Sequence, residues 1–232
     1  MSPNRTIALA SAAAMALVGI DVGFILRSYN EGAMVAPLIQ KVFSAEYEHN
    51  VPAVYSAVLA LWCTVLLVRI SMSPQGQTAR KRWVFLAIIC GFLALDELLA
   101  LHEYLPSISG GIYSWADKTV WDHVTDVAWL TPYAAALVAC VFFGSFVLKW
   151  PPRTRNLTIL AASIFLSGAI ILETAGFALH RVGLEHADLL VELLGSMEEG
   201  LEMAGIIVFG YALMLYSSHA PSSRALKEER SC

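Results

Sequence analysis

Six apolar segments dominate the sequence, and each has the roughly 20 residues that an α-helix needs to cross the ~30 Å hydrocarbon core of a bilayer. They occupy residues 7–26, 51–70, 83–103, 127–148, 157–180 and 189–216. Hydrophobic residues make up 57% of the 232 residues and charged residues only 15%, which leaves too little polar surface to cover a soluble globule. The sequence therefore predicts an all-α fold, a polytopic membrane bundle of six transmembrane helices.

The domain organisation follows from these segments. Residues 1–219 are expected to form one six-helix transmembrane domain, and residues 220–232 a short cytoplasmic tail. The first segment resembles a secretory signal, but its apolar run continues past any plausible cleavage site, so we interpret it as a retained helix. The longest connections, 27–50 and 104–126, have room for short interfacial helices in the outer loops.

The positions of Lys and Arg predict the orientation, because positive residues near the ends of spans stay on the cytoplasmic side. With six spans and both termini inside, eleven of the fifteen basic residues are cytoplasmic. They are Arg5, Arg69, Arg80, Lys81, Arg82, Lys149, Arg153, Arg155, Arg224, Lys227 and Arg230. Trp83 and Trp150 are then expected at the inner interface as parts of an aromatic belt. We therefore predict a multi-pass protein with both termini in the cytoplasm, located in a bacterial-type inner membrane.

The acidic residues are distributed in a way that the positive-inside rule does not explain. Seventeen of the nineteen Asp and Glu residues map to the outer half or the outer loops of this topology. Helical rise places one layer of carboxylates near mid-membrane: Asp96, Glu173, Glu198, Glu199 and Glu202. A second layer, roughly two to three turns further out, contains four more groups. These are His102, Glu103, His180 and Glu192.

Helical phase favours convergence of these groups on a shared interior. Glu103 follows Asp96 by seven residues and His180 follows Glu173 by seven, so each pair shares one face of its helix. Small residues let membrane helices approach closely, and we expect this of five glycines on the last two spans. They are Gly168, Gly176, Gly195, Gly200 and Gly205.

The negative charge of several carboxylates at this depth must be neutralised, because inserting one charge at the bilayer centre costs roughly 2.5–3.5 kcal/mol on insertion scales. Neighbouring carboxylates in a low-dielectric layer also resist ionising together. Either several are protonated or a cation is bound. Carboxylates with one or two imidazoles favour Fe, Mn or Zn over Cu(I). The pattern resembles the inward-facing glutamates of di-iron carboxylate bundles, although the sequence has no Glu-x-x-His.

We predict from these features an integral membrane metalloprotein that holds a divalent metal (Fe, Mn or Zn) in the outer half of the bundle. The candidate ligands are Asp96, His102, Glu103, Glu173, His180, Glu199 and Glu202. Such a protein would be an oxidoreductase or a hydrolase, with no residue assigned a catalytic role. One alternative is a proton or divalent-cation transporter or channel that uses the same acids. The other is a structural subunit of a larger membrane complex.

The partners expected are the lipid bilayer and either a lipophilic substrate or a membrane complex. Nucleic acid is not expected, because membrane topology already accounts for the basic residues. His102, His180 and Glu192 lie near the ends of spans, so their alternative role is to face the headgroups.

Overall fold

The computed structural model describes residues 2–32, 37–44, 50–99, 141–182 and 187–218, and within these ranges the chain is helical with no strand. This confirms the predicted all-α class for the described residues. The elements are α1 (Pro3–Glu31), α2 (Pro37–Phe43), α3 (Val51–Met72), the short η1 (Gln77–Ala79), α4 (Arg80–Leu99), α8 (Pro152–Leu166), the π-helical η2 (Ser167–Leu172), α9 (Glu173–Val182) and α10 (Ala187–Ser218).

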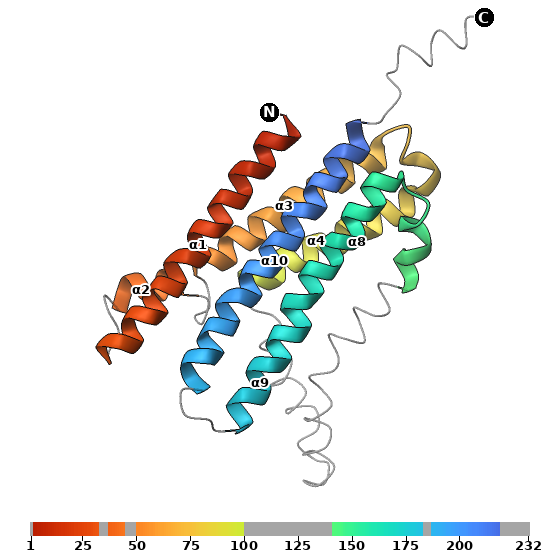
Figure 1. The fold of residues 1–232 in the computed structure, drawn as a ribbon. Helices are drawn as coiled ribbons and strands as arrows, with labels where there is room; N and C mark the ends of the chain where they lie inside the picture. Colours follow the sequence, from red (N-terminus) through yellow and green to blue (C-terminus); the bar gives the residue numbers. More distant parts are fainter. Residues whose placement is uncertain (1, 33–36, 45–49, 100–140, 183–186, 219–232) are drawn as a thin grey trace, which may run out of the picture.

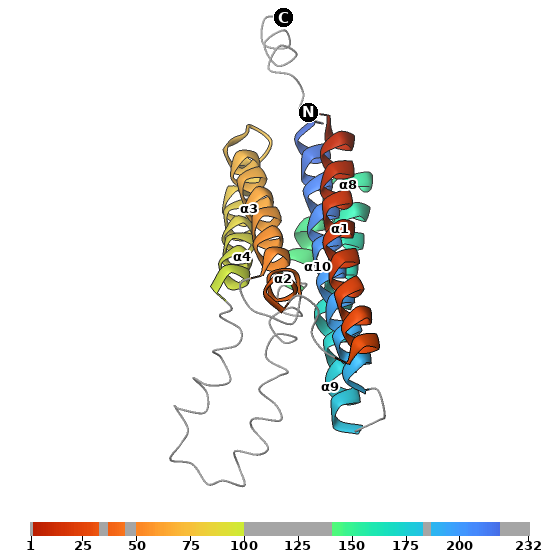
Figure 2. The ribbon, with the colours of Figure 1, turned by 90° about the vertical axis from the view of Figure 1, so that its left-hand side faces the viewer.

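Helix α10 is the central element of the bundle. It packs against α1, α3, α8, η2 and α9, whereas α4 packs chiefly against α3. Figures 1 and 2 show α3 and α4 side by side in one layer, with α1, α10 and α8 in the other. Segments η2 and α9 continue the line of α8 toward the far end of the bundle, so one long helical unit lies along α10 (Figure 1).

Local sequence explains where the α3–α4 hairpin begins and turns. The Asn50 side chain caps α3 by accepting a hydrogen bond from the Ala53 amide at 2.6 Å, and Pro52 occupies the first turn. At the other end the Ser73 hydroxyl donates to the Ile70 carbonyl at 2.7 Å. A Cβ on Gly76 would collide with that same carbonyl, so only glycine allows the chain to turn this tightly into α4.

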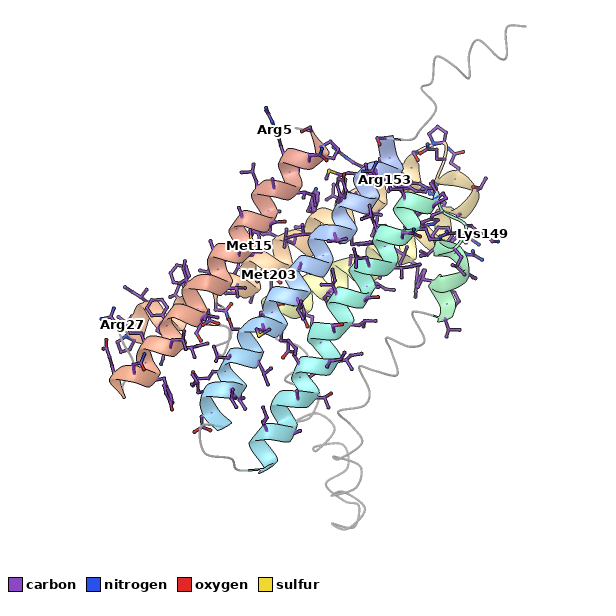
Figure 3. The ribbon with its side chains drawn as sticks, in the orientation of Figure 1. Arg5, Met15, Arg27, Lys149, Arg153 and Met203 are labelled. Carbon is purple, nitrogen blue, oxygen red and sulfur yellow. The ribbon has the colours of Figure 1, made fainter. Side chains whose placement is uncertain are left out.

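Among the described residues, four helical segments are long and apolar enough to cross a membrane: Pro3–Glu31, Val51–Met72, Pro152–Gly176 and Asp188–Ser218. Large apolar side chains also cover the outside of the bundle, as Met15 does on α1 (Figure 3) and Ile88 on α4, which are 69% and 60% exposed. A water-soluble monomer rarely exposes so continuous an apolar surface. Both features are compatible with the predicted membrane protein.

The predicted count of six spans is not confirmed. Helix α4 covers the predicted third span as far as Leu99, and the rest of that span lies outside the described residues. Of the predicted fourth span only residues 141–148 are described, and 141–147 are helical. The 220–232 tail is also outside the description. A short helix, α2, is present in the 27–50 connection, with Leu38 and Ile39 exposed.

An aromatic cluster closes one end of the bundle. It consists of Trp83, Phe146, Trp150 and Tyr216. The Trp83 and Trp150 rings are stacked with centroids 4.7 Å apart, and Phe146 meets Trp83 edge-on at 5.0 Å. Trp83 is 1% exposed and Trp150 5%, so both rings are covered by protein, and their expected place at the inner interface stays a prediction. Their rings bury one another and thereby join α4, α10 and the segment before α8.

The same end of the bundle is basic. In Figure 3, Arg5, Lys149 and Arg153 lie together at one end of the molecule, and Arg27 lies at the other. Every described Lys and Arg side chain except Arg27 and Lys41 belongs to a helix end or turn on that side. We call it the basic end. Arg27 forms an ion pair with Glu31 at 2.8 Å at the opposite end.

Candidate carboxylate site

The half of α10 away from the basic end is acidic. It carries Asp188, Glu192, Glu198, Glu199 and Glu202, and α10 contains no Lys or Arg. The last three occupy little more than one helical turn and are half-buried against neighbouring helices. The centre of the bundle thus contains a concentration of negative charge on its central helix.

The π-helical segment η2 lies directly on this turn of α10. A Cβ on Gly168 would be 2.8 Å from the Glu198 carbonyl oxygen and 3.3 Å from Cγ of Glu202, so glycine is required for this contact. Short π-helical insertions interrupt α-helices rarely and are frequent at functional sites. Here the insertion ends at Glu173, the first residue of α9.

Five glutamates from three helices interact electrostatically. The Glu202 carboxyl is subject to the charges of Glu199, Glu97, Glu198 and Glu173, in decreasing order. Glu198 is subject in turn to those of Glu173 and Glu199. We call this group, which combines α4, α9 and α10, the acid layer. The predicted ligands Glu173, Glu199 and Glu202 all belong to it.

On α4 the member of the acid layer is Glu97, which the sequence analysis did not select. The buried face of α4 includes Trp83, Ala87 and Ala94, and Glu97 is the next residue of that stripe, three positions after Ala94. Asp96, the predicted candidate, lies about 100° around the helix from Glu97. The spacing of Trp83, Ala87 and Ala94, four and then seven residues apart, marked the packed face in the sequence, so this signal could have found Glu97.

Glu198 was also missed as a candidate. It shares a side of α10 with Glu202 and Gly205, and a Cβ on Gly205 would be 2.7 Å from Cβ of Phe165 on α8. That side therefore faces α8 and η2. Glu199 instead shares a side with Ile206, whose carbonyl accepts a hydrogen bond from the Cys63 thiol of α3 at 3.6 Å. The spacing to Gly205 could have assigned Glu198 to the α8-facing side.

Not all the glycines act as expected. Close approach to a neighbouring helix is confirmed for Gly168, Gly200 and Gly205. The described residues do not show it for Gly176 and Gly195, where a Cβ would meet none of their atoms within 4 Å. The close contacts all lie along α10, the helix with most neighbours.

Polar groups extend from the acid layer into the bundle. Ser196 on α10 and Ser56 on α3 are 1% and 0% exposed, and their hydroxyls have no hydrogen-bond partner among the described residues. Asp21 on α1 is 2% exposed. It lies one turn from Val18, which a Cβ on Gly200 would touch at 3.1 Å, and therefore near the level of Ser196. Three helices contribute buried oxygen atoms here.

The structure describes the side chains of four predicted metal ligands: Asp96, Glu173, Glu199 and Glu202. His180 lies two turns after Glu173 in α9, but its side chain is not described, and His102 and Glu103 are outside the described residues. Within the described part of the chain, no three His, Cys, Asp or Glu residues are placed to hold one metal ion. The metal site stays a prediction.

A family model described as a domain of unknown function, DUF8692, matches residues 6–217. The chain belongs to the DUF8692 family. The match runs from the first turn of α1 to the last turn of α10, so the acid layer lies within the DUF8692 domain itself. No curated protein and no solved structure gives a significant match.

Proposed function

We propose that the protein is a membrane proton transporter or channel whose acid layer takes up protons within the bundle. The observation that carries this proposal is that glutamates of α4, α9 and α10 are near enough for their charges to act on Glu202. Acidic side chains inside a membrane bundle are rare and commonly belong to ion or proton pathways.

Physical chemistry favours the proton as the transported species. Neighbouring carboxylates in a low-dielectric layer resist ionising together, so the group has affinity for a cation as a unit. No three of the described carboxyl groups are placed to hold one metal ion, which suits transfer from group to group better than chelation. Ser196 and Glu199 are three residues apart on α10, and a hydroxyl both donates and accepts.

The proposal includes six spans with both termini in the cytoplasm. The basic end supports it, because Lys and Arg at the ends of spans are retained in the cytoplasm. The acid layer then lies in the outer half, open to protons from outside. A reporter fused after Lys227 should be active in the cytoplasm, and activity on the outer side would contradict this orientation.

The function can be tested with the full chain in liposomes that enclose a pH-sensitive dye. A potassium gradient with valinomycin sets an inside-negative potential, and the dye reports proton entry. Liposomes with the protein should acidify faster than protein-free liposomes. Equal rates would contradict the proposal. Asp188→Asn is a matched control, because Asp188 lies on α10 but is exposed in its first turn.

The second candidate function is the metal centre predicted from the sequence. It is favoured by the helical segment α9, which contains both Glu173 and His180 seven residues apart. His102, Glu103 and Asp96 would complete such a site for an oxidoreductase or hydrolase. Stoichiometric Fe, Mn or Zn in protein purified without chelator, together with no proton flux, would favour it. Neither flux nor metal would favour a structural subunit of a membrane complex.

A further inference from the structure

An open cavity of about 310 Å³ lies between α8 and α10 near the basic end, and no residue of the acid layer lines it. It is lined by Arg153, Asn156, Leu157 and Leu160 of α8 and by Tyr211 of α10. The four α8 residues are spaced as one helical stripe, so they form a continuous wall. The Tyr211 hydroxyl hydrogen-bonds to Oδ1 of Asn4 at 3.2 Å, which ties the opposite wall to the first turn of α1.

The wall changes from polar to apolar with depth. Arg153 lies at the basic end, and Leu160 lies seven residues further along α8, about 10 Å deeper at 1.5 Å per residue. In a bilayer this places Arg153 at headgroup level and the two leucines among acyl chains. A molecule that fits both parts of the wall must have a polar head and an apolar tail.

The polar part of the cavity wall carries the positive charge of Arg153, which can bind a ligand. Among the described residues Arg153 makes no ion pair or hydrogen bond, whereas Arg155 donates to the Leu148 carbonyl at 3.5 Å and to Oδ1 of Asn156 at 3.4 Å. The amide Nδ2 of Asn156 remains able to donate. A guanidinium binds phosphate through two parallel hydrogen bonds, and basic pockets between helices on the cytoplasmic side recognise anionic headgroups.

We propose that this cavity is a binding site for an anionic phospholipid of the cytoplasmic leaflet. Its phosphate binds Arg153 and the Asn156 amide, and one acyl chain lies along Leu157 and Leu160. The site rests on the proposed orientation but not on the proposed proton transport, because no residue of the acid layer contributes to it.

The test is native mass spectrometry of the full chain released from vesicles of phosphatidylcholine and phosphatidylglycerol with matched acyl chains. The wild type should retain phosphatidylglycerol in preference to phosphatidylcholine. Arg153→Gln should lower that occupancy on the order of fivefold, the effect of one basic residue near an anionic surface. Lys81→Gln is the matched control, because Lys81 is an exposed charge at the same end that does not line the cavity. It should retain the lipid within about twofold.

A second variant separates the lipid site from a loss of folding. Leu160→Trp keeps every charge and fills the apolar part of the cavity, and Leu160 is half exposed, so the bundle should tolerate it. It should also reduce lipid retention, with helix content unchanged by circular dichroism. Equal losses in Arg153→Gln and Lys81→Gln, or displacement of the lipid by inorganic phosphate alone, would overturn the proposal.

Discussion

The basic end and the acid layer of the bundle are held together by different kinds of interaction. At the basic end, four aromatic residues pack ring against ring, with Trp83 at the centre of the group. At the acid layer, α10 meets η2 through a glycine, and the side chains beside that contact are glutamates. The basic end has large rigid surfaces, and the acid layer has small residues and charge.

In the proposed transporter, the contacts that stabilise the bundle and the groups that carry protons are separated along the helix axes. Lipid tails are as apolar as a protein core, so helices in a bilayer associate through packing and not through the hydrophobic effect. Stacked rings supply such packing at the basic end. Carboxylates of the acid layer oppose association, and acidic groups within membrane helices are usually functional.

Trp83→Ala should cause the largest loss of stability. Removing a fully buried ring typically costs about 3–5 kcal/mol in a protein core. Trp83 contacts Phe146, Trp150 and Tyr216, so the loss would loosen three segments at once. Unfolding in detergent, followed by circular dichroism, should show a large fall in melting temperature. Phe92→Ala is the control, because Phe92 is 56% exposed on α4, and a comparable fall there would contradict the account.

An intermediate effect is expected from Gly168→Ala, which acts at the acid layer. The added Cβ would lie 2.8 Å from the Glu198 carbonyl, a backbone atom that cannot rotate away. Overpacking of this kind costs about 1–3 kcal/mol, and the displaced η2 should also lower proton flux. Gly176→Ala is the matched control, because a Cβ there meets no atom of the described part of the chain within 4 Å. If the two variants had equal melting temperatures and equal proton flux, the η2–α10 contact would contribute neither to stability nor to transport.

The smallest effect should distinguish two adjacent carboxylates on α4. Glu97→Gln is expected to slow proton entry several-fold, because the charge of Glu97 acts on Glu202. Asp96→Asn should leave the rate within about twofold, since it lies about 100° around the helix from Glu97. Both substitutions preserve size and should leave the melting temperature nearly unchanged. A larger effect of Asp96→Asn than of Glu97→Gln would show that Asp96, the candidate predicted from the sequence, is the functional carboxylate of α4.

The sequence predicted the helical class because long apolar segments allow few other structures. It also predicted that carboxylates of α9 and α10 lie at one depth, since helical rise alone sets depth. It did not distinguish Asp96 from Glu97. Neighbouring residues of a helix differ by only about 1.5 Å in depth along the axis, but their side chains point about 100° apart around it. Which of the two side chains points into the bundle depends on which face of α4 is packed, and Ala87 and Ala94 mark that face.

Two other features could not be read from the pattern of residues. The π-helical insertion at Ser167–Leu172 changes the register of the chain before Glu173, and no residue in this apolar stretch marks it. The burial of Trp150 depends on stacking with Trp83, a residue far away in the sequence. An aromatic residue at the end of a span therefore suits an interface and a core equally well until its partner is known.

The central claim is that the acid layer carries protons, and the most direct measurement is proton entry into liposomes that contain Glu202→Gln. Glu202 is the residue on which four other glutamates act, and glutamine keeps its size while removing proton exchange. The account predicts that the variant, with unchanged helix content and melting temperature, loses flux by about tenfold or more, while Asp188→Asn retains it. Undiminished proton entry through Glu202→Gln would contradict the account.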